Sequence, residues 1–179
     1  MDTAFRKRSE YEAVRWRRQL KLYAYEPLPA SQLATYLGIT IISPTELPDF
    51  DARFIDQLLQ KDSTSWSAVT IPVPGHKPII IYNPSHSSAR HESNIMHELA
   101  HIILKHAPVS IPESPGFPIL RQTFNAEDEK EAQYLGSCLQ IPRRGLDWAI
   151  GRKMTPQQIA DHFGASLQMV RYRCNMTGY

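Results

Sequence analysis

Two histidines four positions apart, with a glutamate directly after the first, form the string with the clearest chemistry in this chain: His97-Glu98-Leu99-Ala100-His101. On a helix, residues four apart share one face, so both imidazoles can bind one ion while Glu98 projects beside them. Zinc accepts this geometry, and it lowers the pKa of a bound water to about 7, so that a nearby carboxylate can take its proton. The spacing therefore predicts hydrolytic zinc chemistry with Glu98 as the general base.

A third ligand must come from another segment. The extended zinc motif that adds a third histidine would place it at position 107, where this chain has Ala107. The acidic string at residues 127–131 offers four carboxylates, and helical geometry favours Glu129, because Glu129 shares a face with Ala132 and Gly136. Small side chains at those two positions would let this helix pack close against the first. We therefore expect Glu129 to complete the site with the two histidines.

Other polar residues near these ligands are expected to have supporting or structural roles. Gln133, one turn after Glu129, is placed to hydrogen-bond a ligand. Glu127 and Glu131 are expected to point away, and an acidic first turn is favoured by the helix dipole. His106 projects on the apolar side of the first helix at its end, where we expect it to bond a terminal carbonyl.

Two helices must carry the ligands. Helical spacing continues to about residue 106, and Pro108 stops it. Asn125 is the expected N-cap of the second helix, residues 126–140. Residues 107–120 contain four prolines and predict a long irregular loop between the two helices. Such a loop beside a metal helix can form the rim of an active site.

A small sheet and further helices are predicted around this pair. Helices are expected over the basic first 25 residues, over 31–37 and over 50–60, from the spacing of their apolar residues. Ser31 is the expected N-cap of the second of these, and Gly38 is placed to end it. Extended segments are predicted at 39–42, 66–73 and 78–82, where β-branched and aromatic residues gather.

Both ends of the chain are basic. Residues 1–25 carry seven lysines and arginines against three acids, and residues 143–179 carry six against two. Solvated helix faces produce such counts more often than nucleic-acid binding does. The C-terminal segment nevertheless predicts a helix-turn-helix pair, with a second helix that carries Arg171 and Arg173. A few cations on such a helix can contact DNA phosphates, so DNA binding remains an alternative to a hairpin that completes the core or docks a substrate.

Composition points to a folded protein of the cytoplasm. Two cysteines, Cys138 and Cys174, are too few for a disulfide framework, and neither belongs to a Cys-x-x-Cys pair. The first residues lack the apolar core of a secretory signal, and no apolar run is long enough to cross a bilayer. We therefore expect a cytoplasmic protein without membrane contact.

The sequence resembles the ImmA/IrrE-type zinc metallo-endopeptidases of bacteria and their mobile elements. The resemblance covers about residues 31–178 and excludes the basic N-terminal helix. It is carried by the segment Ile79 to Asn83, the string Met96 to Leu104 with His106, the string Glu129-Lys130-Glu131-Ala132 with Leu139 to Pro142, and the C-terminal residues Ile159-Ala160, Phe163-Gly164, Ser166, Met169 to Arg173 and Thr177-Gly178.

This resemblance implies a zinc ion held by His97, His101 and Glu129, with Glu98 catalytic. It implies an α+β, zincin-like metallopeptidase fold with a small β-sheet, a helix that carries the His-Glu-x-x-His string and a C-terminal helix-turn-helix-like hairpin. The expected parts are a basic N-terminal helix, the metallopeptidase domain and the hairpin, at residues 1–28, 29–150 and 151–179. Family members resemble regulators that cut a helix-turn-helix repressor or a similar transcription factor.

Two functions therefore stand after the sequence alone. The first is a zinc endopeptidase that cleaves a repressor or another transcription regulator. The second is a DNA-binding transcriptional regulator whose metal site is structural or sensory, with weak nucleic-acid contact through the hairpin.

Overall fold

The computed structural model describes residues 2–46, 56, 66–73, 75–106 and 125–179. Over these residues the chain forms seven α-helices, a short 3-10 helix and a three-stranded sheet, which together make an α+β fold. The helices are α1 (Thr3–Gln19), α2 (Ala30–Leu37), α4 (Ser88–Leu104), α5 (Ala126–Gln140), α6 (Arg143–Gly151), α7 (Pro156–Phe163) and α8 (Leu167–Thr177). The strands are β1 (Thr40–Ile42), β2 (Ala68–Ile71) and β3 (Ile79–Tyr82), and the 3-10 helix is η1 (Pro44–Glu46).

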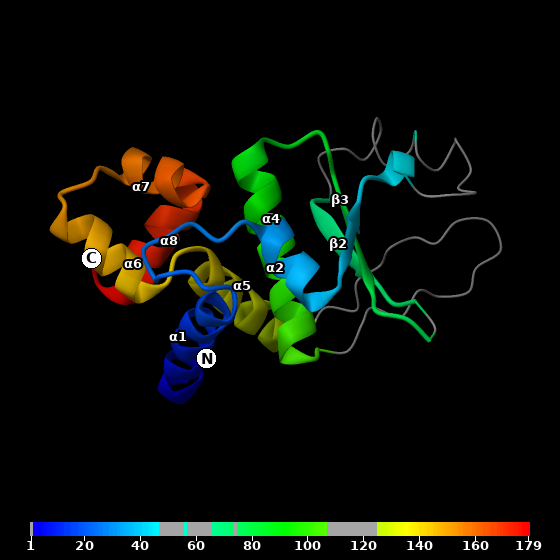
Figure 1. The fold of residues 1–179 in the computed structure, drawn as a ribbon, viewed down its shortest axis with the longest axis horizontal. Helices are drawn as coiled ribbons and strands as arrows, with labels where there is room; N and C mark the ends of the chain where they lie inside the picture. Colours follow the sequence, from blue (N-terminus) through cyan, green and yellow to red (C-terminus); the bar gives the residue numbers. More distant parts are fainter. Residues whose placement is uncertain (1, 47–55, 57–65, 74, 107–124) are drawn as a thin grey trace.

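The sheet lies on one side of α4, and the remaining helices other than α2 lie on the other side (Figure 1). Its order is β1-β3-β2, with β1 parallel and β2 antiparallel to β3. The apolar run of β3 explains this central place. Ile80 and Ile81 point to opposite faces of the sheet, and both are buried. Within the described strands, β2 therefore stands at an edge of the sheet, next to α4.

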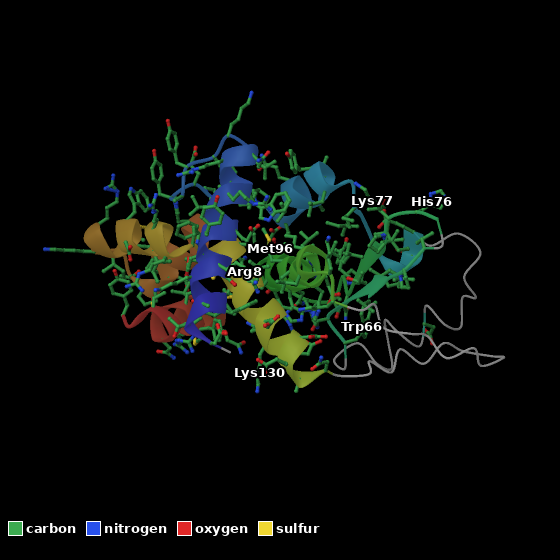
Figure 2. All side chains as sticks on the ribbon, turned by 90° about the horizontal axis from the view of Figure 1, so that it is seen from below. Arg8, Trp66, His76, Lys77, Met96 and Lys130 are labelled. Carbon is green, nitrogen blue, oxygen red and sulfur yellow. The ribbon has the colours of Figure 1, made fainter. Side chains whose placement is uncertain are left out.

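Helices α4 and α5 pack closely at the centre of the molecule. Met96 on α4 is fully buried and lies between the sheet and the other helices (Figure 2). Ala132 on α5 is also fully buried, and a Cβ added at Gly136 would come within 3.1 Å of the Met96 carbonyl oxygen and 3.2 Å of the His97 backbone. The predicted close approach through small residues is confirmed.

The N-terminal helix α1 packs against α5 and shares its core. Arg17 on α1 is completely buried, and its guanidinium donates to the carbonyl oxygens of Leu139 at 2.6 Å and Gln140 at 3.1 Å. Those carbonyls lie at the C-terminus of α5, where a helix leaves acceptors without partners. A cation there also interacts favourably with the negative end of the helix dipole. The basic segment therefore contributes at least one of its charges to the interior.

The C-terminal helices form the predicted hairpin on a second small core. Thr155 caps α7 in a capping box with Gln158, Gly164 ends it in the left-handed conformation at φ +62°, and Ser166 caps α8 by accepting from the Met169 amide. The last helix, α8, continues to Thr177.

The helix predicted over the first 25 residues is shorter and ends at Gln19, and one predicted cap differs from the structure. Gly38 ends α2 at φ +67°, as expected, but Ser31 is not its N-cap. The cap position is Pro29, and the Ala30 amide instead donates 2.7 Å to the Glu92 carboxylate on α4. The loop predicted at 107–120 lies outside the described residues, as does the helix predicted at 50–60 except for Asp56. Among the described helices, none is long and apolar enough to span a membrane.

Candidate metal centre

The two histidines of the His-Glu-x-x-His string project from α4 one turn apart. Their Nε2 atoms lie 3.0 Å from each other, and the ring planes are nearly perpendicular, at 78°. Leu99 and Ala100, two of the three residues between them, are fully buried and hold α4 in the core. The helix therefore directs both nitrogens to one point, as the spacing of four predicts.

Glu129 reaches the same point from the first turn of α5. Asn125 caps this helix by accepting from the Glu127 amide, which places the glutamate opposite α4. One carboxylate oxygen of Glu129, Oε2, lies 3.1 Å from His97 Nε2, and the other, Oε1, lies 3.4 Å from His101 Nε2. One ligand atom from each of these three residues lies within 4.8 Å of the others. The structure thus brings together the three residues that were predicted as ligands.

Electrostatics keep these donors in forms that bind cations. Burial, together with the neighbouring His97, lowers the pKa of His101 to about 4, so its imidazole is neutral near pH 7. The hydrogen bond with His97 is the main cause that lowers the pKa of Glu129, which stays a carboxylate. A neutral imidazole beside a carboxylate and a second histidine is a nitrogen and oxygen donor set that suits zinc. The residues present therefore fit the metal that the sequence implies.

Glu98 lies beside these donors and is nearly buried, with 7% of its surface exposed. The Thr70 hydroxyl on β2 donates to its Oε2 at 2.6 Å. Burial raises the pKa of Glu98, whereas the hydrogen bond from Thr70 opposes this rise. The strand thus orients this carboxylate, a role for Thr70 that the sequence analysis missed.

His106 was expected to bond a terminal carbonyl, but its side chain instead contacts two other side chains. Helix α4 ends at Leu104, and Lys105 adopts the left-handed conformation at φ +59°, which turns His106 away from the helical projection. Its Nδ1 lies 2.9 Å from Nδ1 of His101, and its Nε2 lies 3.4 Å from Oε2 of Glu131. Glu131 was expected to point away. Its carboxylate instead lies beside His106, which in turn contacts the predicted ligand His101.

A cleft of about 820 Å³ opens beside Glu98 and two of the three predicted ligands. One wall is formed by residues 66–69 at the start of β2, and another by the N-terminal half of α4. Gln133 lines the cleft too, together with Glu129. Within the described part of the chain, it does not form the predicted hydrogen bond to a ligand. The outer wall comes from the hairpin and consists of Ser166, Gln168, Met169 and Tyr172. No local signal in the sequence indicated that the hairpin reaches the cleft.

Comparison with known proteins identifies a family. A family model of peptidases, described as the IrrE N-terminal-like domain, matches residues 34–175. This range contains the His-Glu-x-x-His string, Glu129 and all of the hairpin except the end of α8, and it leaves out α1. No curated protein and no solved structure matches the chain.

Proposed function

Because the chain belongs to the IrrE N-terminal-like family of peptidases, we propose that it is a zinc-dependent endopeptidase with a zincin-like fold. His97, His101 and Glu129 hold the metal on this proposal, and Glu98 is the general base. The substrate is a helix-turn-helix repressor or another transcription regulator in the cytoplasm. The catalytic part is residues 29–150, flanked by the N-terminal helix and the C-terminal hairpin.

The observation that carries this proposal is the convergence of two imidazole nitrogens and a carboxylate beside a buried glutamate. The ligand atoms come from two helices and lie within 4.8 Å of one another. Glu98 is at the position next to His97, and it faces the same cleft. A metal site for structure alone is closed by four protein ligands, whereas three ligands beside a cleft leave room for water and substrate.

The chain's own residues can perform both proton transfers of peptide hydrolysis. Zinc, when bound, supplies Lewis acidity toward water and toward the scissile carbonyl. Glu98 accepts the proton of the attacking water on its carboxylate and then donates it to the leaving amine. Its raised pKa suits this exchange, because a carboxylate of higher proton affinity is a stronger base. Thr70 holds the carboxylate in place through the hydroxyl group.

An extended substrate can bind along β2. This strand is at an edge of the described sheet, and its Ala68 and Val69 line the cleft. A peptide that adds to such an edge forms backbone hydrogen bonds with the strand, and its scissile carbonyl can then face the proposed metal site. His97 and Glu98 line the same cleft.

The alternative, a DNA-binding regulator, receives less support from the hairpin. Arg173 was one of two cations expected to contact phosphates, but its side chain is fully buried. Its guanidinium donates to the Ile141 carbonyl oxygen at 2.8 Å and forms an ion pair with Glu10 on α1. Residues near the N-terminus of α8, which a recognition helix would present to bases, instead line the cleft.

A Glu98→Gln variant tests the proposal. Purified wild-type protein and variant, each loaded with one equivalent of zinc, are incubated with candidate repressors, and fragments are identified by mass spectrometry. We expect the wild type to cut one candidate at a defined bond, and the variant to retain zinc but lose at least about 100-fold in rate. Equal cleavage by both proteins would overturn the role of Glu98. Nanomolar binding to a specific duplex without cleavage would favour the regulator.

A further inference from the structure

The cleft carries little charge apart from its metal-binding end. Among the described residues that line it, the only acids are Glu98 and Glu129, and the only lysine or arginine is Arg90. The rest are small polar, amide or apolar side chains, together with His97. A substrate side chain with a negative charge therefore has one evident partner in this cleft, and a positive side chain has none outside the metal-binding end.

The backbone of Arg90 lies at a fixed distance from the two histidines of the candidate metal centre, because all three residues are on α4. Arg90 precedes His97 by seven positions, which corresponds to about 10 Å along the helix axis. Its Nη2 donates to the Ser67 hydroxyl at 3.3 Å, across the cleft wall that leads into β2. The guanidinium is exposed, so it keeps further donors for a ligand.

The spacing converts into a position in the substrate. An extended peptide advances about 3.3 Å per residue, so about 10 Å corresponds to three residues. A peptide that lies along β2 with its scissile carbonyl at the metal would therefore carry a side chain near Arg90 about three residues away. A carboxylate there can form a charge-assisted, two-point hydrogen bond with the guanidinium.

We propose that Arg90 forms a specificity subsite for an aspartate or glutamate located about three residues from the scissile bond. This inference rests on the proposed peptidase function and adds the chemical class of substrate that the site selects. The hairpin lines the same cleft with Ser166, Gln168, Met169 and Tyr172, and none of these residues is an acid, a lysine or an arginine that would compete with Arg90 for the substrate.

Peptide hydroxamates test the subsite without a known substrate, since the hydroxamate anchors the peptide on zinc and fixes its register. Two peptide series extend from the hydroxamate in opposite directions, and in each the third residue is Glu, Gln or Lys. Affinities for the zinc-loaded protein are measured by competition with a fluorescent hydroxamate. We expect the wild type to prefer Glu over Gln by about threefold to fivefold in one series, and this preference to shrink in 1 M salt.

Three variants separate Arg90 from a general effect of charge. Arg90→Gln should abolish the preference, and Arg90→Glu should reverse it toward Lys. Arg171→Gln removes an exposed arginine of α8 that does not line the cleft, and it should leave the preference unchanged. Zinc content and thermal midpoint of each variant show that the centre is intact.

The possible outcomes separate a failure of the Arg90 subsite from a failure of the proposed peptidase function. Zinc-dependent binding without any preference for Glu, or a preference that persists in Arg90→Gln, overturns the subsite and leaves the peptidase standing. Absence of zinc-dependent binding in every series contradicts the metal centre, and the subsite falls with it.

Discussion

The imidazoles of His101 and His106 face each other with their Nδ1 atoms 2.9 Å apart. If Nε2 of His101 binds the metal, its Nδ1 carries the proton and donates it to His106. The remaining N–H of His106, on Nε2, then points to the Glu131 carboxylate at 3.4 Å. A chain of this kind fixes the tautomer and the orientation of a metal ligand.

His106→Ala should therefore weaken zinc binding by about 10-fold to 100-fold, because His101 loses its orienting partner. Competition with a chromophoric chelator measures the dissociation constant. Lys130→Ala is the matched control, since Lys130 projects from the outer side of α5 (Figure 2), and its loss should leave zinc affinity unchanged. Wild-type affinity in His106→Ala would show that the contact does not support the ligand.

Thr70→Val should shift the pH profile of cleavage. The Thr70 hydroxyl donates to Glu98 and so favours its ionised form, which means that removing the donor raises the pKa of this carboxylate further. The general base then stays protonated to a higher pH, and the acid limb of kcat/KM moves upward. Thr70→Ser keeps the donor and should retain the wild-type profile. A limb that moves downward or stays in place in Thr70→Val would contradict the role assigned to this hydrogen bond.

Gly136→Ala should disturb the approach of α5 to α4. The added methyl would lie 3.1 to 3.2 Å from backbone atoms of Met96 and His97, so the two helices must separate by a few tenths of an ångström. We expect a loss of about 1–3 kcal/mol in the free energy of unfolding and weaker zinc binding. Gly151→Ala is the control, because a Cβ there meets no atom within 4 Å, and it should change stability by less than about 1 kcal/mol. Both quantities follow from urea titration and chelator competition.

The predicted ligands could be read from the sequence because each depends on one regular helix. A spacing of four fixes the relation between His97 and His101, and the small residues that follow Glu129 identify the face of α5 that packs on α4. His106 was misjudged because the helix was extended beyond its end. The left-handed Lys105 interrupts the periodicity, and no projection holds after it.

The contacts that the sequence did not reveal join distant segments. Thr70 and Glu98 are brought together by the packing of β2 on α4, and Glu92 caps α2 across a separation of 62 positions. From its position in the hairpin, Arg173 was expected to contact DNA phosphates. It is buried because α1 and α5 pack against it, which the local sequence does not reveal. Local pattern predicts elements and faces, whereas such partners follow from tertiary packing.

The ion pair between Glu10 and Arg173 should make α1 part of the folded unit. Because Arg173 is fully buried, Glu10→Ala would leave its charge without a carboxylate partner, and we expect a cost of about 3 kcal/mol in the free energy of unfolding. Glu12→Ala breaks the partly exposed bridge to Arg15 and should cost less than about 1 kcal/mol. Urea denaturation compares the two. Equal effects would mean that α1 is not held through Arg173.

The metal content of the purified protein tests the central claim most directly. Zinc and protein are quantified in the same samples of the wild type and of Glu129→Ala, His97→Ala and Glu98→Gln variants after dialysis against a weak chelator. We predict about one zinc per chain in the wild type and in Glu98→Gln, and a marked loss in the two ligand variants. A wild type without bound metal, or ligand variants that retain a full equivalent, would contradict the proposed centre.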